Sequence, residues 1–337
     1  MFRAHSSAIR PVLTEANKYA RMKFAMSFVN ANMRFDEMLE HVHLDEKWFY
    51  LTKVTRTFYL VPGEAEPQRN AVARPRYNDD TGKWWDGKIG TWPFVERVQA
   101  RRDSVNRAAG TYETKPITVT KDVYREFLTD KVLPQIVSKW PSPTKKVLLQ
   151  HDNALAHVTS ADAALRIVFD AYKQQGWSFE LAPQLPNSPD TNILDLGFFA
   201  AIQSLQHRKS ARSIDELVAN VACAFETYPF ERLNHTFLIL QSRLVEILKL
   251  FGDNTYKIPH LAKEKQASLG RLPGSLECPH DVFAAAVDKL ERLDGANLDR
   301  VFAEELEAAQ QVDELARVLE GVALNDDETD DITTARN

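Results

Sequence analysis

One stretch in the middle of the sequence alternates between segments of strand and of helix character. Residues 145–153 predict a short buried strand, and the apolar residues over 158–174 have helical spacing that ends at Gly176. Residues 177–181 predict a second strand, and residues 187–199 pass from a polar, Pro-containing turn into a helix. Strands that alternate with helices in this way predict an α/β fold, in which helices flank a mixed sheet.

The segments before this stretch predict the remaining strands. Residues 41–51 are rich in β-branched, aliphatic and aromatic side chains and predict a buried strand, to which residues 57–61 would pair antiparallel. Residues 64–70 are polar and predict a loop, and residues 71–76 begin with a short apolar remnant of a third strand. We expect residues 78–120 to be rich in loops.

Helical spacing of apolar residues recurs on both sides of the expected sheet. The expected helices span residues 14–30, 121–137, 214–227, 233–251, 282–293 and 298–322. Residues 325–337 contain five acids and no apolar run, so a disordered acidic tail is expected there.

The composition is that of a globular protein and excludes several kinds of site. Of 337 residues, 44% are hydrophobic and 26% are charged. No window approaches the roughly 18 to 20 apolar residues of a membrane span, and the N-terminus lacks the apolar core of a signal peptide, so we expect an intracellular protein with no membrane partner. Cys223 and Cys278 are the only cysteines, which fits a reducing compartment and excludes zinc sites built on Cys pairs.

Charge is distributed unevenly along the chain, whose formal net charge is −5. Residues 53–146 contain 18 Lys and Arg against 11 Asp and Glu, whereas residues 275–337 contain 5 against 17. The middle of the chain could therefore hold a polyanion and the C-terminal part could not, although a solvated surface explains the same distribution equally well.

Three acids are placed where the expected sheet would bring them together. Asp45 lies within the strand at 41–51, Asp152 ends the strand at 145–153, and Asp195 begins the helix after the turn at 187–199. Ligands of α/β sheets gather at the carboxyl ends of neighbouring strands. Crowded carboxylates repel one another unless divalent cations neutralise them, and Mg²⁺ is the natural ion for such oxygen ligands. The sequence thus predicts a metal site at Asp45, Asp152 and Asp195.

Each of these acids also has a purely structural explanation. Asp45 can pair with Lys47 along the same strand face, and Asp152 can close the turn after its strand. Asp195 can stand in the first turn of a helix, where a negative charge is favourable. We expect His157 to serve in packing or capping rather than in catalysis.

The amino-acid sequences of the motifs around the acids identify a family more specifically than the spacing of the acids does. The stretches HLDEKWF at 43–49, HDNALAH at 151–157 and NSPDTNILDLGFF at 187–199 together resemble mariner-like transposases, with the closest match to the branch typified by plant and oomycete elements. DGKIGTWPF at 86–94 and NTYKIPH at 254–260 support the resemblance, which extends from Leu13 to Pro273.

The resemblance implies an RNase H-like fold and a DNA-cleaving, strand-transferring enzyme of the DDE superfamily. It implies that Asp45, Asp152 and Asp195 are the catalytic acids and bind two Mg²⁺ ions, for which Mn²⁺ can substitute. By motif position the third acid is Asp195 and not Asp190. The implied partner is DNA, as transposon ends and target, and the implied location is the nucleus. Whether the protein is a homodimer stays open.

Three departures from the family pattern lead us to expect a truncated copy. Relatives carry a helix-turn-helix region before the catalytic domain, and so few residues precede Asp45 here that we expect recognition of element ends to be missing. Between Arg69 and Ala71 the family has most of another strand, and its loss would leave residues 71–76 as a stub and expose the edge of the neighbouring strand. The acidic tail would repel DNA.

Two hypotheses of function follow, with a third that the sequence does not support. The leading one is a metal-dependent DNA endonuclease and strand transferase, and the alternative is a non-catalytic DNA-binding or protein-interaction remnant of a transposase. An unrelated α/β hydrolase lacks support, because neither a Gly-x-Ser-x-Gly elbow nor a phosphate loop occurs. The expected domains are a helical linker remnant at 1–40, the RNase H-like catalytic domain at 41–250, a helical C-terminal extension at 251–324 and the acidic tail at 325–337.

Overall fold

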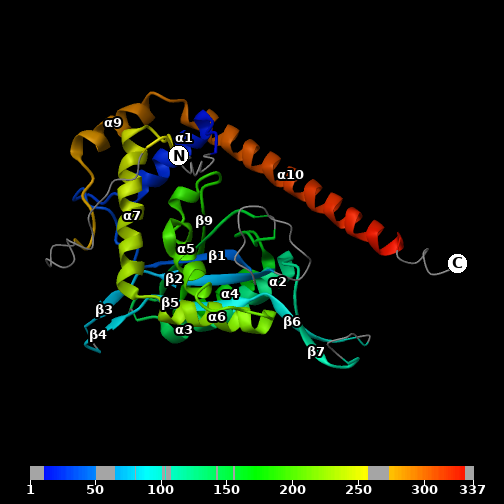
Figure 1. Cartoon of the computed structure of the whole chain (residues 1–337). Helices are drawn as coiled ribbons and strands as arrows, with labels where there is room; N and C mark the ends of the chain where they lie inside the picture. The colour runs from blue at the N-terminus through cyan, green and yellow to red at the C-terminus, as the bar shows by residue number, and fades with distance from the viewer. Residues whose placement is uncertain are drawn as a thin grey trace, which may run out of the picture.

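A computed structural model describes residues 11–50, 65–79, 81–100, 103, 108–141, 143–154, 156–256 and 273–330. At its centre is a five-stranded sheet in the order β5-β2-β1-β8-β9 (Figure 1). Strands β1, β8 and β9 run parallel to one another, and β2 pairs antiparallel with both β1 and β5. The predicted mixed α/β architecture is confirmed.

Five strands make the central sheet and four shorter ones form two hairpins. The sheet strands are β1 (His41–Tyr50), β2 (Ala65–Ala73), β5 (Lys88–Pro93), β8 (Lys146–His151) and β9 (Ser178–Pro183). The hairpin strands are β3 (Arg76–Asn78) with β4 (Lys83–Trp85), and β6 (Val95–Gln99) with β7 (Tyr112–Pro116).

Helices cover the sheet and form the N- and C-terminal parts. Those between residues 117 and 227 are α2 (Lys121–Glu126), continued by η1 (Phe127–Val132) and α3 (Leu133–Lys139), then α4 (Ala163–Gln174), η2 (Pro189–Thr191), η3 (Leu194–Phe198), α5 (Phe199–Gln206) and α6 (Ile214–Thr227). The others are α1 (Glu15–Ser27), α7 (Phe230–Lys249), α9 (His280–Glu291) and α10 (Gly295–Asp330).

The period-two alternation of the strands divides the hydrophobic core between the two faces of the sheet. On β1, Val42 and Leu44 belong to a cluster with α2, α3 and α4, whereas Phe49 belongs to a cluster with α1, α5, α6 and α7. On β2, Ala71 and Val72 separate in the same way. Because successive strand residues point to opposite faces, Asp45 and its neighbour Glu46 also point to opposite faces of the sheet.

Strand β2 contradicts the expected loop and edge stub. Residues 65–73 form one continuous strand inside the sheet, between β1 and β5, and not a loop at 64–70 followed by a remnant. The polar residues Gln68, Arg69 and Asn70 are buried there. The prediction failed because polarity marks a loop only when polar groups face water, and here β-ladders on both sides satisfy the backbone while Glu46 pairs with Arg69. The strand expected at 57–61 lies outside the described residues.

Residues 78–120 were expected to be loop-rich, but the structure forms four strands within them as well as loops. They supply β4, β5, β6 and β7, of which β5 completes the sheet. The β6–β7 hairpin extends beyond the sheet (Figure 1). The alternation of apolar residues over these short strands is interrupted by Gly, Arg and Trp, so period-two patterning does not show in the sequence.

Two helices begin or end at residues other than those expected. Helix α4 begins at Ala163 and not near residue 158, because Asp162 accepts a hydrogen bond from the backbone N–H of Leu165. Helix α10 continues through Asp330, six residues into the segment expected to be disordered, and residues 331–337 lie outside the described part. None of the described helices has the length and apolar content of a membrane span.

Candidate active site

Asp45 and Asp152 lie side by side because of the register of their parallel strands. His43 of β1 pairs with Gln150 of β8, so Asp45 and Asp152 each come two residues later along adjacent strands. Asp45 stands within β1, as predicted, and Asp152 directly follows β8. Both therefore reach the carboxyl end of the parallel part of the sheet, where α/β folds hold ligands.

Asp195 reaches the same place from the segment after β9. Asn192 donates from Nδ2 to Asp45 Oδ2 at 2.5 Å and to Asp195 Oδ2 at 3.3 Å. Its own Oδ1 accepts from the backbone N–H of Leu194 at 2.9 Å, which fixes the orientation of the amide. One side chain thus joins the first and third predicted acids.

Asp152 is held by a buried row of alternating charges. His157 contacts Asp152 Oδ1 through Nδ1 at 2.5 Å and Glu46 Oε2 through Nε2 at 2.9 Å. Glu46 in turn accepts from Nε of Arg69 at 2.7 Å. The backbone N–H of Ala154 donates to Asp152 Oδ1 at 3.1 Å, so the predicted turn after β8 is present together with the proximity to Asp45.

The acids respond in opposite ways to their surroundings. Burial, and then the negative charges of Asp195, Glu46 and Asp152, raise the pKa of Asp45 well above its ordinary value. Burial and the charge of Asp152 also raise the pKa of Asp195. For Asp152 burial is outweighed by the hydrogen bond and charge of His157, which hold its pKa below the ordinary value. Asp45 therefore lacks the compensating positive charge that His157 gives to Asp152, and the charge of Lys47 offsets the rise for Asp195 only in part.

The three predicted acids line one cavity of about 460 Å³. Asn192 and Lys47 line it as well, and so do Leu306, Ala309 and Gln310 from the distant helix α10. Lys47 lies near Asp195, whose pKa it lowers against the effect of burial, and does not pair with Asp45. The cavity is large enough for part of an extended polar substrate, and its walls come from both ends of the chain.

The donor set of this cavity suits a hard divalent cation. No group of three or more His, Cys, Asp or Glu side chains in the described part of the chain already stands in a metal-binding arrangement. The raised pKa values of Asp45 and Asp195 nevertheless mark two carboxylates that repel each other and that a cation would neutralise. Carboxylate oxygens are the ligands that Mg²⁺ and Mn²⁺ prefer. Asp45, Asp195 and the free oxygen of Asp152 are the residues that would hold such an ion.

The competing acid of the turn, Asp190, is engaged elsewhere. Its two carboxylate oxygens accept from Arg21, at 2.8 and 2.6 Å, and the second accepts also from the Tyr256 hydroxyl. Asp190 is not among the residues that line the cavity, whereas Asp195 is. The assignment of Asp195 as third acid thus has a geometric basis, and its catalytic role stays a prediction.

Sequence reasoning missed Glu46, Arg69 and Asn192 as parts of the site and set His157 aside as a packing residue. The position of Glu46 directly after Asp45 gave a signal, since consecutive acids in a buried strand must each find a partner on opposite faces. Arg69 lay in a segment expected to be a loop. Nothing in its sequence context indicated that it would pair with Glu46.

Comparison with known proteins supports the fold. A pre-cleavage Mos1 transpososome has a TM-score of 0.50 at 17% identity, over 76% of this chain and 68% of the Mos1 chain. The fold is similar to that of Mos1. A Mos1 mariner paired-end complex with Mn (TM-score 0.49, 18% identity, 76% and 68% coverage) and the catalytic domain of Mos1 mariner transposase (0.48, 17%, 74% and 100%) are also similar. The RNase H-like fold implied by the motifs is confirmed. No protein-family model and no curated protein matches the sequence.

Proposed function

We propose that the chain is the catalytic part of a mariner-type transposase, which cuts DNA at element ends and joins the 3′-hydroxyl to a target. The observation that carries the proposal is the convergence of Asp45, Asp152 and Asp195 on one cavity from three separate segments. The Mos1 structures, which include complexes with Mn, with Mg and with transposon ends, support the same reading by their fold.

The metal in this proposal is Mg²⁺ or Mn²⁺, in two copies. Bound at the three carboxylates, it would activate the attacking water or hydroxyl and stabilise the leaving oxygen of an in-line phosphoryl displacement. Asn192 keeps Asp45 and Asp195 within reach of a common ion by its two hydrogen bonds. The carboxylates would bind the ion in their ionised form, so ion binding would favour loss of a proton from Asp45, whose pKa is raised by burial and then by the neighbouring negative charges.

The remaining residues of the site orient the acids and receive the substrate. His157, backed by Glu46 and Arg69, fixes one oxygen of Asp152, which lines the cavity. Lys47 supplies the positive charge at the cavity wall that a phosphate of the DNA backbone requires. The DNA partner, a homodimeric assembly and nuclear location belong to the same proposal.

Cleavage of supercoiled plasmid by the purified chain tests the proposal. We expect nicking that requires Mg²⁺ or Mn²⁺ and falls at least about 100-fold in Asp45→Asn and Asp152→Asn, because each removes charge at the reacting centre. Asp170→Asn, on the exposed side of α4, is the matched control and should nick as the unmodified chain does. Folded protein that binds DNA equally in chelator and nicks nothing with either metal would contradict the proposal and support the non-catalytic alternative.

A further inference from the structure

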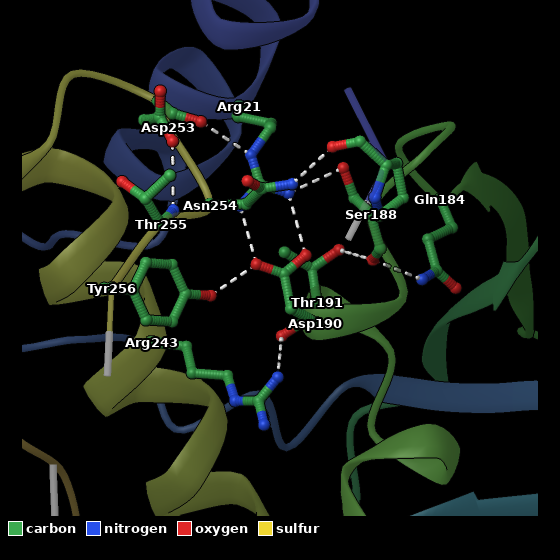
Figure 2. A network of polar contacts seen from close by, with 12 residues as sticks. Arg21, Gln184, Ser188, Asp190, Thr191, Arg243, Asp253, Asn254, Thr255 and Tyr256 are labelled. Carbon is green, nitrogen blue, oxygen red and sulfur yellow. Dashed lines mark hydrogen bonds and ion pairs between the residues drawn. The ribbon is translucent and has the colours of Figure 1, made fainter. Parts of the chain in front are cut away.

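A buried polar network fixes the turn that precedes Asn192 and Asp195 (Figure 2). At its centre is Arg21 of α1, which is only 1% exposed. Its Nη1 donates to Ser188 Oγ at 2.7 Å and to Asp190 Oδ1 at 2.8 Å, and its Nη2 donates to Asp190 Oδ2 at 2.6 Å. A guanidinium that grips a carboxylate with two parallel bonds fixes both position and orientation.

The network is anchored on the far side by the segment after α7. Nε of Arg21 donates to the backbone carbonyl of Gly252 at 2.8 Å, and the Tyr256 hydroxyl donates to Asp190 Oδ2. Gly252 has φ +90°, and a Cβ there would lie 2.1 Å from the backbone oxygen of Lys18, so only glycine allows α1 to approach this closely. The anchor is therefore built into the packing of α1 on this segment.

A hydrogen-bonded turn joins Asp190 to the nearby residue Asn192, which contacts the acids of the candidate active site. The backbone carbonyl of Ser188 accepts from the N–H of Thr191 at 2.9 Å and from Gln184 Nε2 at 3.2 Å. The N–H of Asn192 donates to the Pro189 carbonyl at 3.2 Å. Asn192 is thus two residues from Asp190 within one closed turn, and its amide makes the bonds to Asp45 and Asp195.

We propose that Arg21 and Tyr256 are positioning residues, which act through Asp190 to hold Asn192 and Asp195 in place against Asp45. This inference rests on the proposed function, because it assigns these residues to the metal site of that proposal. It gives α1 a role in the site, and it assigns Asp190 the task of orienting the third acid. Residues that orient metal ligands typically change metal affinity about 10- to 100-fold when mutated.

Mn²⁺ binding to the full chain, measured by calorimetry, tests the inference independently of catalysis. We expect Arg21→Met to weaken Mn²⁺ binding at least about tenfold. Arg74→Met is the matched control: Arg74 is also buried and donates to the Glu37 and Gly274 carbonyls, but it contacts no residue of the turn. It should lower resistance to urea while leaving the affinity for Mn²⁺ within about twofold, since distant sites act independently.

A double variant separates positioning from general stability. Arg21→Met leaves Asp190 as an unpaired, mostly buried acid, whereas Arg21→Met combined with Asp190→Leu removes both charges and should restore much of the urea resistance. We expect the double variant to keep the weakened Mn²⁺ affinity and to nick plasmid slowly. Recovery of normal Mn²⁺ affinity together with stability would overturn the inference alone. Two other outcomes would overturn the proposed function and this inference with it. One is that the unmodified chain does not bind Mn²⁺, and the other is that Asp45→Asn binds Mn²⁺ as tightly as the unmodified chain.

Discussion

At the scale of single residues, the most unusual group of the site is His157, a mostly buried imidazole between two acids. Burial alone would lower its pKa, but the hydrogen bonds and charges of Asp152 and Glu46 raise the pKa of His157 to about 9. The protonated ring therefore keeps Asp152 ionised and oriented at neutral pH. Arg69 at the end of the row allows Glu46, whose pKa falls to about 2, to stay ionised although it is buried.

This arrangement predicts how stability depends on pH. The folded pKa of His157 lies above the unfolded value of about 6.5, so its contribution is fully present below that value and is lost as pH rises through about 9. We expect the free energy of unfolding to fall by up to about 3 kcal/mol between these limits. Urea titrations from pH 6 to pH 10 would measure it. His157→Gln should flatten the slope in this window, and an equally steep slope in that variant would contradict the assignment.

The sequence predicted three acids that the structure places around one cavity, but not the groups that support them. Asp45, Asp152 and Asp195 follow from strand ends and motif wording, which are local features. The contacts of Glu46 with His157 and Arg69 join residues far apart in the chain, and no local pattern encodes which buried charge meets which. Asp190 shows the same limit, because no local pattern in the sequence indicated that its carboxylate would pair with Arg21.

At the scale of elements, β2 is an interior strand of the sheet that contains buried polar residues where apolar residues are usual. It is central in the sheet, yet Gln68 Nε2, Arg69 Nη2 and Asn70 Oδ1 are buried without a hydrogen-bond partner. Register pairs Asn70 with Asp45, so an unpartnered amide oxygen lies beside the first acid of the site. Propensity cannot predict such a strand, since its formation depends on neighbours on both sides and on the ion pair of Arg69 with Glu46.

Two substitutions in β2 should therefore change stability in opposite directions. Asn70→Val removes a buried unpartnered oxygen and adds a β-branched side chain, which should outweigh the loss of the long 3.2 Å hydrogen bond from Nδ2 to the Gln68 carbonyl, so we expect up to about 1 kcal/mol of stabilisation. Arg69→Met removes the partner of a buried Glu46 and should cost about 3 kcal/mol. Equilibrium urea unfolding of both variants measures the difference. Loss of stability in Asn70→Val would show that its amide is better satisfied than the contacts indicate.

At the scale of the whole molecule, helix α10 connects the C-terminal part to the cavity that the three acids line. Glu305 accepts from Asn17 and Thr14 of the α1 region, Asp299 pairs with Lys23, and Leu306 lies in the cavity wall. Beyond these contacts α10 extends away from the sheet (Figure 1). Residues 295–330 contain 11 Asp and Glu against 2 Arg, so this helix brings negative charge close to the cavity that it helps to line.

Removal of residues 295–337 should therefore strengthen DNA binding. We expect at least about fivefold tighter binding of duplex DNA at low ionic strength, with the difference shrinking as salt is added, because the repulsion is electrostatic. Fluorescence anisotropy at several salt concentrations measures this. A full-length chain with Glu304 and Glu307 changed to Gln loses negative charge but keeps the helix, so it distinguishes electrostatic repulsion of DNA from steric obstruction of the cavity by α10. Equal affinity of the shortened and full chains at every salt concentration would contradict the prediction.

The contacts of Arg21 also bear on when, during synthesis, the site can form. The chain leaves the ribosome from its N-terminus, so Asp45, Asp152 and Asp195 are all present before Tyr256 is made. A nascent chain that ends before residue 256 thus carries every acid without the complete support for the turn at 188–192. Pairings so distant in sequence form late in folding. A partly synthesised chain is accordingly expected to hold its acids loosely, so the activity proposed for this site would develop only when the chain is nearly complete.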